Sequence, residues 1–239
     1  MPSRGKPERV LLKLSGGALS GPQGTPFGEQ ALAYIAGQVA DARSTGTRIA
    51  VVLGGGNVLR GASFYPEGAG RLRADYAGMM ATVINALVLR QRLEDLGLPV
   101  VHYSAFPVPR IAEAFEPARC IADLDAGRLV LLAGGTGCPL FSTDTAAVLR
   151  AIEIGAGLVL KVTRVDGVYT ADPETTPGAE RIERISCADV LRRRLGVMDL
   201  TAVSLCLQHS LPVRVFNYGR PGNLRRAVAG EDVGTLMEG

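Results

Sequence analysis

The chain has 239 residues, of which 47% are hydrophobic, and this size fits one α/β domain or two small lobes around a sizeable core. The net charge of +3 comes from scattered arginines rather than from a basic stripe with interleaved aromatics, which argues against nucleic acid as the main ligand. No apolar run approaches a membrane span and the first residues lack the apolar core of a signal peptide, so we expect a cytoplasmic protein without a membrane partner.

Strand-like and helix-like segments alternate along the chain, which predicts an α/β fold with a mostly parallel central sheet and helices on both faces. We expect strands at residues 9–14, 48–53, 100–103, 129–133 and 213–217, and a further strand from residue 158 onward. Helices are expected at residues 29–45, 75–96, 144–154, 187–195 and 199–209, the third of them with Asp144 as its N-cap. Residues 9–239 are predicted to form a single domain and residues 1–8 a flexible tail.

Two lysines stand inside segments that otherwise have the pattern of buried strands. Lys13 lies in Arg-Val-Leu-Leu-Lys-Leu-Ser and Lys161 in Leu-Val-Leu-Lys-Val-Thr, and strands this apolar are normally covered on both faces. A buried ammonium group needs an anion, and a glycine turn after each strand places both lysines near carboxyl ends of strands, where open α/β sheets bind ligands. Two interpretations follow: lysines that reach from edge strands to water, or a phosphate-binding site.

Three glycine-rich turns follow three of the expected strands, and such turns let backbone N–H groups converge on phosphate oxygens. They are Ser15-Gly16-Gly17, Gly54-Gly55-Gly56-Asn57 and Gly134-Gly135-Thr136-Gly137. One such turn is often only a tight connection, but three of them together with two strand-end lysines favour phosphate binding. The P-loop and protein-kinase motifs do not occur, and Leu59 breaks the dinucleotide spacing, so those enzyme classes are excluded.

The sequence offers few metal ligands. Its four cysteines have no C-x-x-C spacing and are accompanied by only two histidines, so we expect reduced thiols and no protein-held metal. These residues are Cys120, Cys138, Cys187, Cys206, His102 and His209.

Seven segments, taken together, resemble the bacterial UMP kinases of the amino acid kinase family. They are Lys13-Leu-Ser-Gly16, Gly54-Gly-Gly-Asn-Val-Leu-Arg60-Gly, Arg73-Ala-Asp75-Tyr-Ala-Gly-Met79, Thr136-Gly-Cys-Pro-Leu-Phe-Ser-Thr143-Asp144, Lys161-Val-Thr163-Arg-Val-Asp-Gly-Val-Tyr169-Thr-Ala-Asp172, Val197-Met-Asp199-Leu and Val215-Phe-Asn217. All stand in the family's order. The resemblance implies an αβα sandwich that transfers the γ-phosphoryl group of ATP to UMP in pyrimidine nucleotide biosynthesis. It also implies ATP and Mg²⁺ as requirements and a homohexamer regulated by GTP and UTP.

Carried over residue by residue, the resemblance assigns a role to three groups of residues. Lys13, Lys161 and Arg60 supply positive charge to the transferring phosphoryl group, and Asp199 orients the lysines. ATP contacts fall mainly in the C-terminal part and are assigned to Lys13, Leu14, Ser15, Gly16, Gly56, Arg60, Thr163, Tyr169 and Asp172. UMP contacts fall mainly in the N-terminal part and are assigned to Gly55, Asp75, Thr136, Gly137, Cys138, Pro139, Leu140, Phe141, Ser142 and Thr143.

The implied chemistry agrees with what the residues offer. Transfer between two phosphates needs no protein nucleophile, because the accepting phosphate oxygen is already ionised near neutral pH. Positioning and neutralisation of charge therefore provide most of the catalysis, and a chain with two histidines can perform it.

Several candidate residues have a purely structural interpretation as well. Asp75 is either a helix cap or a partner of the UMP ribose hydroxyls, and Asp144 is expected to be a cap rather than a ligand. Asp199 also fits a helix cap, Asp172 a turn, and Tyr169 either a core aromatic or an adenine contact.

Two departures from the family pattern leave the acceptor and the regulation open. Cys138 stands where relatives commonly have Asn, and Gly17 replaces an acidic residue, while the segment at 21–26 contains two prolines. One alternative is a paralogue that phosphorylates another phosphate or phosphonate. A second is a non-catalytic nucleotide- or oxyanion-binding protein on the same scaffold, and a third, a dinucleotide-dependent oxidoreductase, fails on the glycine spacing.

Overall fold

The computed structural model describes residues 6–59, 67–171, 175–176 and 178–239. Its centre is a nine-stranded sheet with the strand order β4-β3-β5-β2-β1-β6-β10-β11-β9. Neighbouring strands pair in parallel, except that β11 runs antiparallel to β10. The predicted α/β fold, with a mostly parallel central sheet between helices, is therefore confirmed.

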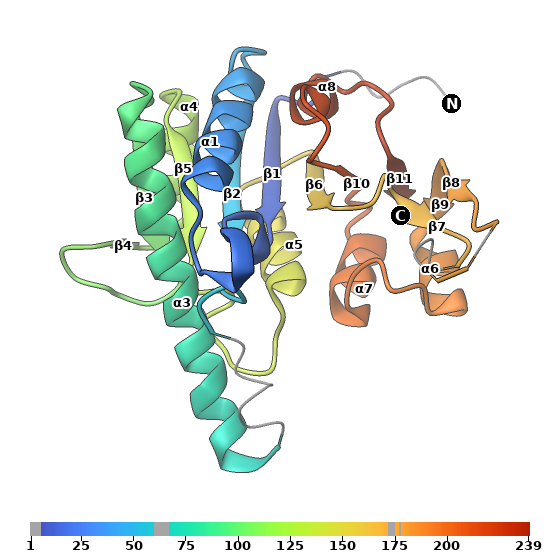
Figure 1. Cartoon of the computed structure of the whole chain (residues 1–239), viewed down its shortest axis with the longest axis horizontal. Helices are drawn as coiled ribbons and strands as arrows, with labels where there is room; N and C mark the ends of the chain where they lie inside the picture. The colour runs from blue at the N-terminus through green and yellow to red at the C-terminus, as the bar shows by residue number, and fades with distance from the viewer. Residues whose placement is uncertain (1–5, 60–66, 172–174, 177) are drawn as a thin grey trace.

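The strands and helices form three layers (Figure 1). The strands of the large sheet are β1 (Arg9–Leu14), β2 (Arg48–Leu53), β3 (Val100–Ser104), β4 (Glu113–Ala114), β5 (Leu129–Ala133), β6 (Leu158–Thr163), β9 (Arg184–Ser186), β10 (Val213–Asn217) and β11 (Thr235–Glu238). A separate antiparallel ribbon consists of β7 (Val168–Tyr169) and β8 (Arg181–Ile182). Helices α1 (Glu29–Arg43), α3 (Gly68–Asp95) and α8 (Asn223–Val228) cover one face, and α4 (Pro117–Asp125), α5 (Thr143–Glu153), α6 (Cys187–Arg193) and α7 (Leu200–Gln208) cover the other.

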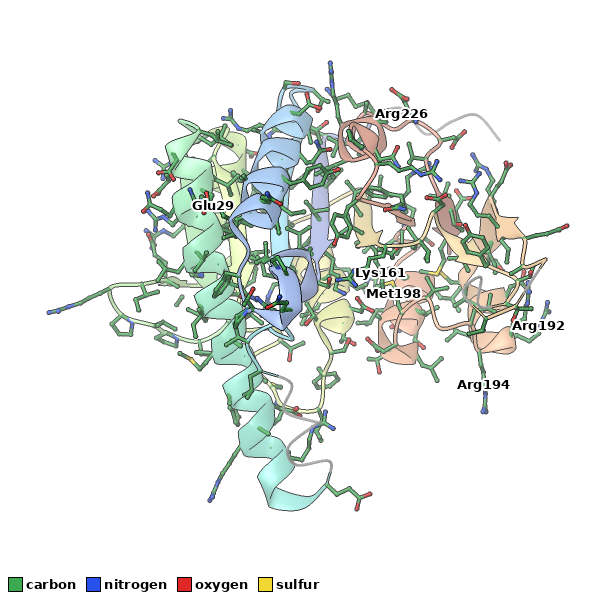
Figure 2. All side chains as sticks on the ribbon, in the orientation of Figure 1. Glu29, Lys161, Arg192, Arg194, Met198 and Arg226 are labelled. Carbon is green, nitrogen blue, oxygen red and sulfur yellow. The ribbon has the colours of Figure 1, made fainter. Side chains whose placement is uncertain are left out.

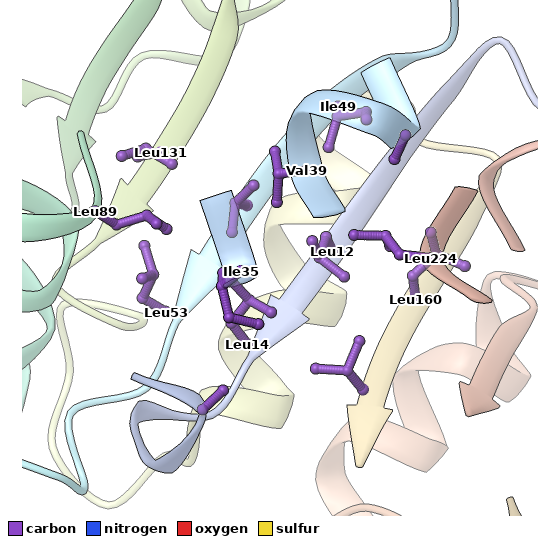
Figure 3. Close-up of a cluster of buried hydrophobic side chains, with 14 of the residues drawn as sticks. Leu12, Leu14, Ile35, Val39, Ile49, Leu53, Leu89, Leu131, Leu160 and Leu224 are labelled. Atoms are coloured by element: carbon purple, nitrogen blue, oxygen red, sulfur yellow. The ribbon is translucent and has the colours of Figure 1, made fainter. Parts of the chain in front are cut away.

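Two hydrophobic cores lie on the two faces of the sheet, since successive residues of a strand point to opposite sides. Leu12 and Leu160 pack with Val39 of α1 in one core, which Figure 3 shows. Leu11 and Val159, their neighbours in the chain, pack in the core beneath α5. The central strands are mostly apolar because both of their faces are covered.

Four expected strands, at residues 9–14, 48–53, 129–133 and 213–217, have the predicted bounds. Helix α3 begins at Gly68, seven residues before the predicted start at Asp75, and its first turns extend past the end of the sheet (Figure 1). Of the two interpretations of Asp75, the one that makes it the cap of this helix is therefore wrong. Because those turns have no sheet to pack against, they lack the core-facing apolar stripe of an ordinary surface helix.

The remaining differences between the predicted and the observed structure lie at the ends of the chain and in the short elements. Of the predicted tail, residues 6–8 pack against the turn before β2, where Thr47 Oγ1 donates to the Pro7 carbonyl and the Arg48 N–H to the Glu8 carbonyl; residues 1–5 lie outside the described part. Helices α4 and α8 and the strands β4, β7, β8, β9 and β11 were not predicted. Among the described residues, no helix is both long and apolar enough to cross a membrane.

Candidate active site

Lys13 and Lys161 are direct neighbours on adjacent strands, because the parallel register of β1 and β6 pairs one with the other. Residues paired in this way point to the same face of a sheet. That face is the one that α5 covers, and Figure 2 shows Lys161 near the middle of the molecule. The fold thus brings together two ammonium groups that are far apart in the sequence.

Asp144, in the first turn of α5, binds both lysines. Its Oδ1 lies 2.9 Å from Lys13 Nζ and its Oδ2 lies 2.6 Å from Lys161 Nζ. Lys161 also donates a hydrogen bond to the Val197 carbonyl oxygen. The side chains of Lys13, Lys161 and Asp144 are only 11%, 13% and 13% exposed, so the interpretation of lysines that extend into water is wrong.

The charges in this cluster shift each other's pKa values. Burial disfavours the ionised form of Asp144, but the charges of Lys13 and Lys161 outweigh burial and hold the pKa of the carboxyl below its usual value. Burial lowers the pKa of Lys161, the charge of Asp144 opposes that shift, and the charge of Lys13 adds to it. With all three groups ionised, two ammonium groups face one carboxylate, and the surplus positive charge suits an anionic ligand.

Asp199 contacts residues that are close to Asp144 in the chain. Its Oδ1 accepts the Ala202 N–H at 3.0 Å as the N-cap of α7, and its carboxylate also accepts the hydroxyls of Ser142 and Thr145. The direct contact to the lysines is made by Asp144 instead, and Asp199 fixes the beginning of the helix that carries Asp144. Burial lowers the pKa of Lys161 overall, and the charge of Asp199 opposes that lowering less strongly than the charge of Asp144 does.

The expectation that Asp144 caps α5 is wrong for a related reason. Ser142 is the N-cap, and its Oγ accepts the N–H groups of Asp144 at 2.9 Å and of Thr145 at 3.3 Å. Because Ser142 performs the capping, the carboxylate of Asp144 is free to turn towards the sheet and pair with the lysines.

The glycine turns after β1 and β2 are packed against each other. A Cβ on Gly16 would lie 2.2 Å from Asn57 Oδ1, so only glycine fits there. Asn57 and Asn85 exchange two amide hydrogen bonds, at 3.0 and 2.6 Å, which fix the second turn on α3. Gly55 packs against the same helix, where a Cβ would lie 2.5 Å from the Gly78 carbonyl oxygen. The two turns therefore hold their backbones at the edge of a shared cavity.

The loop of residues 136–143 is anchored by Asp75. Oδ2 of Asp75 accepts the Leu140 N–H at 2.9 Å, and Oδ1 pairs with Arg71 Nε at 2.8 Å. Leu140 has a φ of 72°, in the left-handed region, which this hydrogen bond helps to hold. Thr136 closes the turn on itself, since its Oγ1 accepts the Cys138 N–H and donates to the Cys138 carbonyl oxygen. The Cys138 side chain is exposed beside this loop.

Two cavities lie next to the lysine cluster. The glycine cavity, of about 420 Å³, is lined by Lys13, Ser15, Gly16, Gly17, Gly54, Gly55, Gly56, Thr143 and Arg164. The Tyr169 cavity, of about 430 Å³, is lined by Thr163, Val165, Gly167, Val168, Tyr169, Ala171, Arg194, Leu195, Gly196, Val197 and Val215. Lys161 is next to a lining residue of each, because its in-register neighbour Lys13 lines the first cavity and its hydrogen-bond acceptor Val197 lines the second.

Eight of the predicted site residues line these cavities: Lys13, Ser15, Gly16, Gly55, Gly56 and Thr143 the glycine cavity, and Thr163 and Tyr169 the Tyr169 cavity. Asp75 and residues 136–142 line neither of the two cavities. Leu14 is buried in the hydrophobic core, so only its backbone faces the site, where its carbonyl accepts the Gly54 N–H. Tyr169 lines a cavity and is not a plain core aromatic. Arg60 and Asp172 lie outside the described residues.

Sequence reasoning missed several residues at the site. They are Asp144 as the carboxylate between the lysines, Arg164, and the segment of residues 194–197. The serine two positions before Asp144 was the available signal for the first of these, since it is an equally good N-cap. The sequence held no comparable signal for the others.

The described residues contain no group of three or more His, Cys, Asp or Glu side chains able to hold a metal ion. The two carboxylates nearest the lysines are already engaged, Asp144 by ammonium groups and Asp199 by hydroxyls and a backbone N–H. Within the described residues, the site therefore lacks the free carboxylates that a protein-held magnesium ion needs.

Known proteins resemble this chain in sequence and in fold. The model of the amino acid kinase family matches residues 8–217. A uridylate kinase of Ectopseudomonas mendocina (strain ymp) is 46% identical over 231 residues, which cover 97% of this chain and 94% of that protein. One of Methylococcus capsulatus (strain ATCC 33009 / NCIMB 11132 / Bath) is 45% identical and covers 96% of each. The crystal structure of UMP kinase from Bacillus anthracis superposes with a TM-score of 0.93 at 37% identity, covering 97% of this chain and 96% of that one.

Proposed function

The chain belongs to the amino acid kinase family, within its uridylate kinase branch, and from that premise we propose that it transfers the γ-phosphoryl group of ATP to UMP. The products are UDP and ADP, and the reaction is a step of pyrimidine nucleotide biosynthesis. Neither the relatives nor the solved structures support a different acceptor or a non-catalytic role.

One observation supports this proposal most strongly: Lys13 and Lys161 lie side by side, in register, and share Asp144. Each ammonium group has three N–H donors and no acceptor. Asp144 uses only part of that capacity, and it holds both groups in place before the substrate arrives. Preorganised donors of this kind stabilise charge where it develops in the transition state.

The bond changes need no further catalytic group. An oxygen of the UMP phosphate attacks the γ-phosphorus of ATP, and the bond from that phosphorus to the β,γ-bridging oxygen breaks. The electron pair of that bond leaves with ADP, and no proton has to move. The lysines offset the negative charge on the transferring group, while the cavities align donor and acceptor.

The two cavities divide the substrates between them in this proposal. The donor base and ribose occupy the Tyr169 cavity, with Thr163 and Tyr169 as contacts, and the polyphosphate reaches the glycine cavity with Lys13, Ser15, Gly16 and Gly56. UMP binds at Gly55, Asp75 and the 136–143 loop, with its phosphate towards Thr143. Arg60 and Asp172 belong to the same proposal by resemblance to the family.

Magnesium enters this proposal as the Mg²⁺–ATP complex, held by the nucleotide's own phosphates. The ion neutralises phosphate charge when bound. The protein's part is to bind the complex through lysine side chains and glycine N–H groups, and we route no step through a protein-held metal.

We also propose that the enzyme is a homo-oligomer, a hexamer by resemblance to the family. An apolar stripe on α3 supports self-association, since its side chains recur every three or four residues and are each 40–49% exposed: Leu72, Tyr76, Met80, Ile84 and Leu87. Light scattering after size exclusion tests the oligomeric state, and Met80→Glu combined with Ile84→Glu is expected to reduce the assembly.

The cytoplasm, where both nucleotides are available, is the proposed location.

A coupled assay of ADP release tests the acceptor. The enzyme is supplied with Mg²⁺–ATP and, in turn, UMP, CMP, dTMP and small acid phosphates, and the highest kcat/KM is expected for UMP. Faster turnover of an acceptor without uridine would contradict the assignment, and so would binding of Mg²⁺–ATP without turnover of any acceptor. Cys138→Asn shows in the same assay what the cysteine contributes to the KM for UMP.

A further inference from the structure

Arg164 lies on the turn between β6 and β7, directly after the strand that carries Lys161. Its two chain neighbours, Thr163 and Val165, line the Tyr169 cavity, whereas Arg164 lines the glycine cavity together with Lys13. Thr163 Oγ1 donates to the Val165 carbonyl oxygen at 2.6 Å, which holds the turn in this form. The guanidinium group thus lies at the glycine cavity, on a turn whose other side faces the Tyr169 cavity.

Arg164 is uncommitted in the described structure: within residues 6–59, 67–171, 175–176 and 178–239 it makes no ion pair or side-chain hydrogen bond. The carboxylate closest in the chain, Asp166, is bound by Arg220 and by Asn217, the latter at 3.0 Å. Asp144 is shared by the two lysines. A free arginine beside a cavity that already contains Lys13 leaves the cavity with excess positive charge.

Gly17 lines the same cavity and lies beside Arg164. A Cβ at Gly17 would have only two neighbours within 4 Å, Ser15 Oγ at 3.9 Å and Arg164 Nη2 at 4.0 Å. Its φ is not in the left-handed region, so the backbone does not require glycine here. The missing side chain leaves open space next to the guanidinium group and places no carboxylate there to neutralise it.

We propose that Arg164 binds the polyphosphate of the donor nucleotide, as a third cation beside Lys13 and Lys161, and that Gly17 keeps its guanidinium group available. A guanidinium group donates two parallel hydrogen bonds to phosphate oxygens, which a single ammonium group cannot do. Its place at the glycine cavity matches the course of a chain of phosphates that begins at a ribose in the Tyr169 cavity. The proposal rests on the proposed function, from which it takes ATP as the donor. It makes no assumption about the acceptor.

Direct titration of the full chain with Mg²⁺–ATP, without any acceptor, tests this role. Arg164→Gln is expected to raise the Kd by about tenfold or more, the size expected for a lost charge-assisted hydrogen bond, and Arg164→Lys to recover part of the loss. Arg110→Gln is the matched control, because Arg110 is an exposed arginine of the loop between β3 and β4. It should leave the Kd unchanged.

A Kd for Arg164→Gln within twofold of wild type would overturn the proposal, as would an equal loss in Arg110→Gln. A wild-type protein that binds Mg²⁺–ATP but does not phosphorylate UMP would contradict the proposed function alone, since this titration contains no acceptor.

A second pair of variants tests the role of Gly17. Gly17→Glu introduces a carboxylate within reach of Arg164 and is expected to weaken Mg²⁺–ATP binding more than Gly17→Gln, which has nearly the same shape and no charge. If the introduced carboxylate acts by pairing with Arg164, the double variant Gly17→Glu, Arg164→Gln loses less affinity than the product of the two single losses. A loss equal to that product would contradict the pairing.

Discussion

Two regions of the same sheet bury basic side chains and treat them in opposite ways. On β1 and β6, Lys13 and Lys161 are 11% and 13% exposed and share the carboxylate of Asp144. On β3, His102 is 2% exposed, and in the described structure neither of its ring nitrogens has a hydrogen-bond partner. Burial, together with the nearby charge of Arg90, lowers the pKa of His102 to about 4.

The difference shows what a buried charge requires. The charge of Asp144 opposes the lowering of the Lys161 pKa that burial causes, whereas His102 has no carboxylate to oppose that effect and is neutral at physiological pH. A fixed positive charge in a dry site is useful for binding phosphate, so the lysine cluster has the character of a binding site. His102 has the character of a side chain that packs as an apolar group.

Removing either lysine tests the first half of this comparison and has the largest expected effect. Lys13→Met or Lys161→Met is expected to lower kcat by about 10³-fold or more, since each loses a contact concentrated in the transition state. Circular dichroism should show an unchanged fold. A variant that keeps more than about a tenth of wild-type turnover has lost only about 1.4 kcal/mol, and its lysine would then have no catalytic role.

Asp144→Asn would make the lysines resemble His102, because it removes their compensating charge and keeps the shape. We expect kcat to fall by about 10²-fold. Asp144 is the group that most strongly opposes the lowering of the Lys161 pKa by burial, so its loss lowers that pKa further. The alkaline limb of the pH–rate profile should therefore move to lower pH, and an unmoved limb would contradict this account of the cluster.

Acid is expected to destabilise the folded protein through the buried His102. Its pKa is about 4 in the folded protein and near 6.5 when unfolded, so the unfolded chain binds the proton more tightly. This contribution to stability is complete above pH 6.5 and is lost as the pH falls towards 4, which amounts to about 2 kcal/mol by pH 5.

The control for this prediction is His102→Leu, which has no titrating group at the position. Denaturant unfolding at pH 7.5 and pH 5 should show that wild type loses about 2 kcal/mol more than the variant. Equal losses would mean that His102 is not buried as a neutral side chain.

Asp199→Ala has the smallest expected effect of these variants. It removes the N-cap of α7 and leaves the contacts between Asp144 and the lysines in place. The free energy of unfolding should fall by about 1 kcal/mol. Since Asp199 also binds the hydroxyls of Ser142 and Thr145 at the start of α5, kcat should fall as well, but less than in Asp144→Asn. A larger loss of kcat in Asp199→Ala than in Asp144→Asn would restore the direct role that the sequence had suggested for Asp199.

The parts of the fold that the sequence predicts best are those with two buried faces. The strand at residues 129–133 is a continuous apolar run, and the strand at residues 9–14 is apolar apart from Arg9 and Lys13. Both are bounded by polar or glycine residues, and their predicted bounds agree with the structure. Helix α8 (Asn223–Val228) and strand β11 (Thr235–Glu238) are too short to show a period, and the first turns of α3 lack a core-facing stripe.

At the site, the lysines were predictable because a charge inside an apolar run is conspicuous. The role of Asp144 was not, since Ser142 and Asp144 are equally good N-caps in the sequence, and the structure shows that Ser142 is the cap. Arg164 resembles every other exposed arginine in the sequence, and only the fold of the turn after β6 places it at a cavity with Lys13.

The central claim is that Lys13 and Lys161 hold the transferring phosphoryl group between donor and acceptor. A crystal structure of the full chain with ADP, UMP and aluminium fluoride, which mimics that group in flight, tests it most directly. We predict that both Nζ atoms lie within about 3 Å of the fluoride ligands, with Asp144 still between the lysines. An aluminium fluoride bound elsewhere, with either ammonium group turned away from it, would contradict the claim.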